Sequence, residues 1–162
     1  MGKTITVAAP GAANMQFAEP TLEEIKKMSF QEQSQVMCDL ANRADTPICR
    51  TYATWTPNIK LGFWYRLGEW MEQGIVAPIP EGYKLSANAQ AVLQTLQGLD
   101  SGQQITVLRN TVLDMGFDSS KMDNFTRVMV ILKSKSRAKF KLLGLCGSRH
   151  EYVLAIFAKF GK

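Results

Sequence analysis

Side chains that could carry out catalysis are few in this sequence. It contains one histidine, His150, so a histidine-based triad or a histidine-rich metal site is hard to build. The cysteines lack CxxC spacing and give no zinc motif. The acids Asp39, Glu69 and Asp100 form no persuasive pair, and the segment GLDSGQQ lacks the glycine spacing of a phosphate loop. We therefore expect a protein that is not an enzyme and holds no metal.

The residues best suited to bind a ligand lie in one short segment, NIKLGFWYRLGEWMEQG, from Asn58 to Gly74. At about 100° per residue, a helix over this segment has two apolar faces. One face holds Ile59, Phe63, Leu67 and Trp70, and the other holds Leu61, Trp64, Gly68 and Met71. A surface helix has a single apolar face, so two faces predict a helix at the centre of the fold.

Gly68 lies between Trp64 and Met71 on the second face. A glycine in a helix interior costs about 1 kcal/mol relative to alanine, but it allows a very close approach. Tight packing against another helix is the more common reason for such a glycine. The alternative is a pocket wall made of an indole and a thioether, which suits a flat apolar ligand. The residues alone leave both interpretations open.

Capping patterns predict a series of helices that position this segment. Ser29 with Glu32 forms a capping box, and Thr21 with Glu24 matches the same pattern. The alternative for the latter is a longer helix that is kinked at Pro20. The helix after Ser29 carries Phe30 on its apolar stripe.

Further signals divide the rest of the first part. Thr46 caps a third helix, Asn58 starts the aromatic helix and Gly74 ends it in a left-handed conformation. Asp100 or Ser101 caps the last helix before Gly116. No alternation of period two is convincing in residues 1–118, so we predict an all-α fold.

Charge divides the chain at about residue 118. Residues 1–118 have a net charge of −3 and residues 119–162 a net charge of +8, which together give the overall +5. We predict a helical domain over residues 1–118 and a basic tail of unknown structure over 119–162. No apolar run reaches the roughly 18 residues of a transmembrane helix.

The phrases CDLANRADTP and NIKLGFWYRLGE, within a match over about the first 118 residues, resemble the N-terminal domain of the orange carotenoid protein family. The resemblance implies two interleaved four-helix bundles that bind one ketocarotenoid non-covalently, of the echinenone, 3'-hydroxyechinenone or canthaxanthin type. It also implies photoprotection: the pigment absorbs light, and the domain quenches phycobilisome excitation and singlet oxygen. The resemblance further implies that a chloride site is associated with the domain.

The resemblance assigns roles to particular residues of this chain. It implies carotenoid contacts at Met37, Leu61, Trp64, Tyr65, Gly68, Met71, Ile79, Pro80, Ile105 and Met115. Arg109 matches the family arginine that contacts a sensory domain in the inactive state and the phycobilisome in the active state. Asn58 matches a polar contact across the same interface. An ordinary solvated helix position is the alternative for Arg109.

The chain also departs from the family pattern. Met1 matches an internal methionine of the family, so we expect an incomplete version of the double bundle, without its first helices and with part of the pocket missing. The match fades after Phe117 and is gone from Met129, where a shifted reading frame or a fused segment would explain the basic tail.

The resemblance implies the phycobilisome as partner, a separate C-terminal-type domain as a second one, and leaves a homodimer open. No nucleic-acid motif accompanies the basic tail, so no nucleic acid is expected. The expected location is the cytoplasm, at phycobilisomes on the thylakoid membrane of a cyanobacterium. The competing hypothesis is an interaction module without pigment, which binds the phycobilisome or an anionic surface through Arg109 or the tail.

Overall fold

The computed structural model describes residues 15–79 and 84–121, and predictions on the remaining residues, including Pro80 and most of the 119–162 tail, lie outside it. Within the described residues the chain forms helices and no strands, which confirms the all-α prediction. The elements are η1 (Met15–Phe17), α1 (Glu19–Lys26), α2 (Phe30–Ala41), α3 (Pro47–Ala53), α4 (Pro57–Glu72), α5 (Ala87–Gly98), α6 (Ser101–Leu113) and η2 (Ser119–Lys121).

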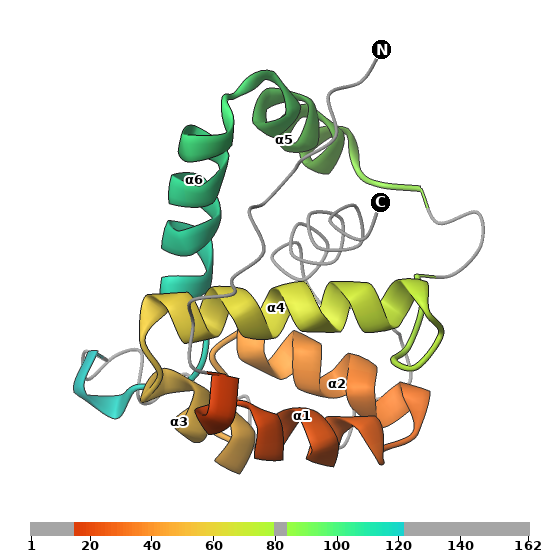
Figure 1. Ribbon diagram of the computed structural model, residues 1–162, viewed down its shortest axis with the longest axis vertical. Helices are drawn as coiled ribbons and strands as arrows, with labels where there is room; N and C mark the ends of the chain where they lie inside the picture. Colours follow the sequence, from red (N-terminus) through yellow and green to blue (C-terminus); the bar gives the residue numbers. More distant parts are fainter. Residues whose placement is uncertain (1–14, 80–83, 122–162) are drawn as a thin grey trace.

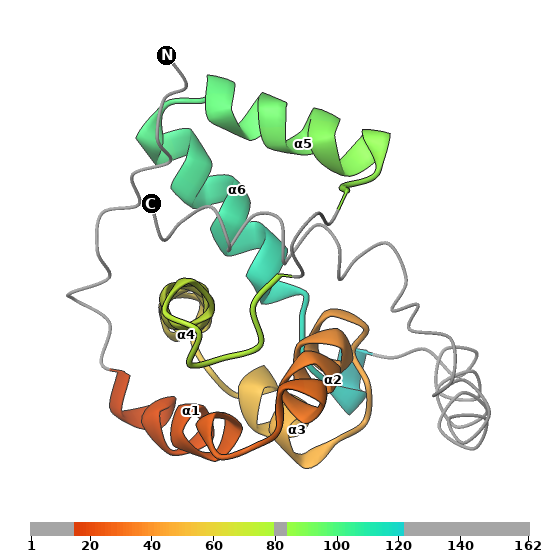
Figure 2. The same cartoon turned by 90° about the vertical axis from the view of Figure 1, so that its right-hand side faces the viewer.

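Helix α4 runs through the middle of the molecule (Figure 1). Helices α1, α2 and α3 lie on one side of it, and α5 and α6 lie on the other (Figure 2). The C-terminal end of α6 packs against α4, while the turn between α6 and α5 lies far from it. The central position predicted for the aromatic helix is therefore confirmed.

Most of the predicted helix starts are confirmed by their capping bonds. The Ser29 hydroxyl accepts from the Glu32 amide, and the Glu32 carboxylate accepts from the Ser29 amide, so the capping box is complete. Thr46 caps α3. Of the two candidates for α6, Asp100 is the cap, because its carboxylate accepts from the Gln103 amide.

Three local predictions are wrong. Thr21 is not a cap: α1 begins two residues earlier, after Ala18, and Thr21 is buried inside the helix. Helix α4 begins at Pro57 rather than at Asn58, because Thr56 supplies the capping hydroxyl and proline fits the first turn. Phe30 is 52% exposed, since the first residue of α2 lies beyond the edge of the core.

Two buried glutamines, Gln33 and Gln104, connect neighbouring helices through hydrogen bonds. The Gln33 side-chain amide donates to the carbonyls of Ile25 and Met28, and its oxygen accepts from the Ala77 amide at 2.7 Å. Gln33 thus ties the end of α1 and the segment after α4 to α2. Gln104 likewise donates from α6 to two carbonyls near the end of α5. Both side chains therefore donate to carbonyls at the end of a helix, where the regular backbone pattern stops.

Candidate functional site

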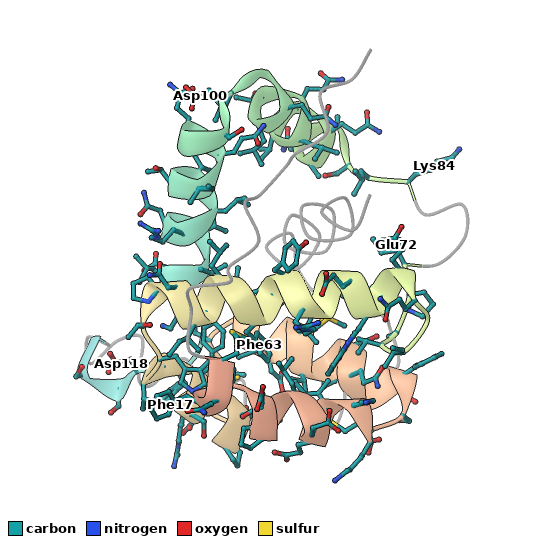
Figure 3. All side chains as sticks on the ribbon, in the orientation of Figure 1. Phe17, Phe63, Glu72, Lys84, Asp100 and Asp118 are labelled. Carbon is teal, nitrogen blue, oxygen red and sulfur yellow. The ribbon has the colours of Figure 1, made fainter. Side chains whose placement is uncertain are left out.

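Both apolar faces of α4 are buried. Phe63 and Leu67 on the first face have no exposed surface, and Figure 3 shows Phe63 on the side of α4 that faces α1–α3. On the second face, Trp64 is also fully buried, and Gly68 is buried beside it. The pattern of two faces predicted from the sequence is therefore confirmed.

Four aromatic rings from α3, α4 and the turn between them form one cluster. Tyr52 and Trp55 lie 5.3 Å apart between ring centroids, and each also lies against Phe63. Phe63 meets Trp64 nearly edge to face, at 5.8 Å and 85°. These tilted and edge-on contacts are the arrangements that aromatic rings prefer, so the cluster has a defined geometry.

A chain of hydrogen bonds runs through this cluster from α4 to α6. The indole N–H of Trp64 donates to the Tyr52 hydroxyl at 2.9 Å. The Tyr52 hydroxyl in turn donates to the carbonyl of Val112, also at 2.9 Å. Tyr52 has no exposed surface, so water does not compete for either bond. Tyr52 thus joins α3, α4 and α6 at one point.

The end of α6 is held by side chains from three other helices or turns. Tyr52 binds the Val112 carbonyl, and Lys60 of α4 places its ammonium nitrogen 3.4 Å from the Leu113 carbonyl. The Arg43 guanidinium donates to the carbonyl of Asp114 and pairs with its carboxylate. Carbonyls at a helix C-terminus have no partner within the helix and attract positive charge, so Lys60 and Arg43 fit this end.

Lys60 is an unusual member of this group because it is only 3% exposed. Its ammonium nitrogen lies 4.9 Å from the centroid of the Tyr52 ring. A cation over an aromatic face is attracted to the ring, and the attraction is stronger when both are removed from water. Lys60 therefore supports the ring whose hydroxyl binds Trp64.

The structure brings most of the predicted ligand residues together. Five of them, Met37, Leu61, Trp64, Met71 and Met115, belong to one hydrophobic cluster. Tyr65 and Ile105 pack against that cluster, Gly68 is buried in α4, and Ile79 is half-buried after α4. Pro80 is not among the described residues. These residues come from α2, α4, α6 and the segments that follow α4 and α6, and the cluster also contains Ile59, Phe63 and Leu67 of the first face of α4.

Asn58 and Arg109 lie elsewhere, on the surface. Asn58 is exposed in the first turn of α4, and Arg109 is exposed on α6. None of the ion pairs found among residues 15–79 and 84–121 involves Arg109. Both residues are therefore accessible to a partner from solution.

Sequence reasoning missed Tyr52 and Lys60. The segment TYATW shows two aromatic residues one helical turn apart, which marks α3 as packed. It carries no sign that Tyr52 would accept a bond from a residue on the next helix. A lysine in the first turn of a helix is normally solvated, so nothing in the sequence singles out Lys60.

The Tyr52 hydroxyl gives the fold a predicted pH dependence. Burial raises the pKa of this phenol far above its ordinary value, and the bond from Trp64 only partly opposes that rise. In the unfolded chain a tyrosine loses its proton at a pH of about 10. The stability that the hydroxyl contributes is therefore complete below about pH 10 and is lost as the pH rises above it.

We expect Tyr52→Phe to remove that part of the alkaline loss, which is about 1.4 kcal/mol per pH unit above pH 10. The measurement is the free energy of unfolding in urea at pH 8, 10 and 11 for both proteins. Identical slopes in the two proteins would contradict the assignment.

Neither a metal site nor a membrane span is found in the part of the chain that the structure describes. No group of three histidine, cysteine or acidic side chains there lies in ligating positions. No helix there is long and apolar enough to cross a membrane. A shallow open depression lies at the start of α6, between Leu99 and Val107, and does not include the residues of the aromatic cluster.

These features define an all-helical domain built around one aromatic-rich central helix. A match to the family described as "Orange carotenoid protein, N-terminal" covers residues 1–118. The chain belongs to this family. It is 74% identical over 128 residues to the orange carotenoid-binding protein of Limnospira maxima, a match that spans 79% of this chain and 40% of that protein.

Two solved structures agree with this assignment. The orange carotenoid protein of Anabaena (Nostoc) sp. PCC 7120, in a structure binding canthaxanthin, is 78% identical with a TM-score of 0.66. The match covers 75% of this chain and 39% of that one. The red carotenoid protein of the same organism, binding a mixture of carotenoids, is 34% identical with a TM-score of 0.61. There the match covers 65% of this chain and 78% of that one.

Proposed function

We propose that residues 1–118 form a domain that binds one ketocarotenoid non-covalently and serves photoprotection. The observation that carries this proposal is the burial of the second face of α4 within one cluster that also holds Met37 and Met115. Family membership over the same residues supports it. The pigment is a ketocarotenoid such as canthaxanthin, echinenone or 3'-hydroxyechinenone, and canthaxanthin is bound in the related Anabaena structure.

The chemistry of the cluster suits a conjugated polyene. A carotenoid is long, flat and apolar, so its binding depends on dispersion contacts and on removal of apolar surface from water. The indole of Trp64 and the sulfur of Met71 are polarizable groups on one helix face, and Gly68 between them leaves room. The carotenoid contacts are the ten residues that the resemblance implies, with Pro80 among them.

Pigment uptake requires a change in the packing around the second face of α4. Trp64 has no exposed surface, and Met37 is 1% exposed. A polyene that contacts these side chains has to take the place of groups that now cover them. The second face of α4 therefore opens when the pigment enters.

The partner surface of this proposal is the exposed side of α6. The exposed guanidinium of Arg109 suits a carboxylate, which it can bind with two parallel hydrogen bonds on docking to the phycobilisome or to a separate C-terminal-type domain. Asn58 adds a polar contact. In this role the protein quenches phycobilisome excitation and singlet oxygen, in the cytoplasm at the thylakoid membrane. The proposal also includes a chloride ion bound to the domain and the formation of a homodimer.

The pigment-free interaction module is not favoured. It explains the exposure of Arg109, but it gives no reason for an aromatic and methionine-rich cluster around a buried helix face. It also leaves the carotenoid-binding relatives unexplained.

Co-expression of the full chain with canthaxanthin tests the proposal. We expect the purified protein to elute with an absorption band in the visible. Gly68→Ala should retain less pigment, because the added methyl group fills space between Trp64 and Met71 on the second face. The matched control is Gly98→Ala, whose added carbon meets no atom within 4 Å, and it should retain pigment like the parent. A colourless, folded parent protein would contradict pigment binding.

The stability of Gly68→Ala also decides whether this glycine lines a pocket or allows tight helix packing. If Gly68 lines a pocket, alanine leaves the pigment-free protein as stable as before or more stable, because alanine favours the helix by about 1 kcal/mol. If Gly68 serves tight helix packing, alanine lowers the stability of the pigment-free protein. Urea unfolding followed by circular dichroism distinguishes these outcomes.

A further inference from the structure

The Tyr52 hydroxyl has a fixed direction in this fold. A phenol has one hydrogen, and here it points to the Val112 carbonyl at 2.9 Å. The lone pairs of the oxygen are therefore free to accept, and one accepts from the indole N–H of Trp64 at 2.9 Å. An indole nitrogen is a donor only, so the bond forms in one orientation of the Trp64 ring.

Neighbouring groups hold both partners of this bond in place. Phe63 lies edge-on to Trp64 and also against Tyr52, which limits rotation of either ring. The Lys60 ammonium lies over the Tyr52 ring at 4.9 Å and reaches the Leu113 carbonyl, one residue beyond the acceptor of Tyr52. Tyr52 is thus anchored at its face by Lys60 and at its hydroxyl by α6.

We propose that Tyr52 is a positioning residue for the carotenoid site, because it sets the plane of the Trp64 indole through this hydrogen bond. The inference rests on the proposed function. A flat polyene packs against an indole with its plane set by that of the ring. Tyr52 therefore determines, without touching the pigment, how the pigment lies against α4. It also ties that geometry to α6, which carries Ile105 and leads to Met115.

The first test needs no pigment. Among the indole N–H signals in a nitrogen–proton NMR spectrum of the full chain, each assigned by a tryptophan-to-phenylalanine variant, Trp64 should exchange with solvent more slowly than half-buried Trp70. Tyr52→Phe removes only the hydroxyl, so the Trp64 signal should move and exchange faster while Trp70 stays unchanged. An unchanged Trp64 signal in this variant would overturn the inference.

The second test compares pigment retention. We expect Tyr52→Phe to hold canthaxanthin about tenfold more weakly, the factor that corresponds to one lost hydrogen bond, with a shifted visible band. The control is Arg43→Ala, which removes the bond to the Asp114 carbonyl and the ion pair at the end of α6 but leaves the Tyr52 hydroxyl in place. It should retain pigment and keep the parent band.

The outcomes separate the inference from the function on which it rests. Equal losses in Tyr52→Phe and Arg43→Ala would mean that docking of α6, rather than the position of Trp64, controls retention, and would overturn the inference. Equal retention by the parent and Tyr52→Phe would do the same while pigment binding stands. If the parent protein takes up no canthaxanthin, both the proposed function and the inference are wrong, whatever the indole signals show.

Discussion

Replacing Gly116 with alanine is expected to lower the free energy of unfolding by about 3 kcal/mol, from backbone strain and overpacking together. Gly116 has a φ of +81°, a backbone conformation that residues other than glycine rarely adopt. A carbon added there would lie 2.6 Å from the Tyr52 ring and 2.9 Å from the Cys49 carbonyl. The backbone cannot simply move away, because the Gly116 amide donates to the Leu40 carbonyl at 2.9 Å.

The matched control for this change is Gly74→Ala. Gly74 ends α4 with a φ of +70°, but an added carbon there meets no atom within 4 Å. Alanine should therefore cost only the strain of the left-handed conformation, about 1 kcal/mol. Urea unfolding of both variants beside the parent measures the difference. Equal losses at the two positions would show that the contact of Gly116 with Tyr52 contributes nothing to stability.

The sequence predicted those parts of the fold that depend on neighbouring residues. The capping box of Ser29 and Glu32, the cap at Thr46 and the left-handed end at Gly74 each involve residues within one helical turn. The same holds for the two buried faces of α4, which follow from helical periodicity alone. The prediction of a cap at Thr21 is wrong because Pro20 fits the first turn of α1. The helix therefore begins before Thr21, which lies inside it.

The parts that could not be predicted depend on residues far apart in the chain. The Tyr52 hydroxyl reaches Val112, and Lys60 reaches Leu113, because α6 returns to the start of α4. The helical periodicity of α4 alone does not decide whether Trp64 belongs to a packed core or to a pocket. Its bond to Tyr52 shows that the indole is held in a fixed place, which both packing and ligand binding require.

Trp64→Ala is expected to lower the free energy of unfolding of the pigment-free protein by about 4 kcal/mol. The side chain is fully buried, so its removal leaves a large cavity against Phe63 and takes the donor away from the Tyr52 hydroxyl. With a typical domain stability of about 5–15 kcal/mol, this loss removes between about a quarter and most of the stability of the domain. Circular dichroism during urea unfolding measures it, and a loss below about 1 kcal/mol would mean that the indole is not part of the core.

Trp64→Phe separates the fold from pigment binding at the same position. Phenylalanine keeps an aromatic ring in the core but has no N–H, so it fills most of the space and makes no bond to Tyr52. The variant should therefore fold with a smaller loss of stability than Trp64→Ala. Under the proposed function it should still lose much of its canthaxanthin, because the flat indole that faces the polyene is gone. Full pigment retention by folded Trp64→Phe would remove Trp64 from the carotenoid site and leave it as a core residue.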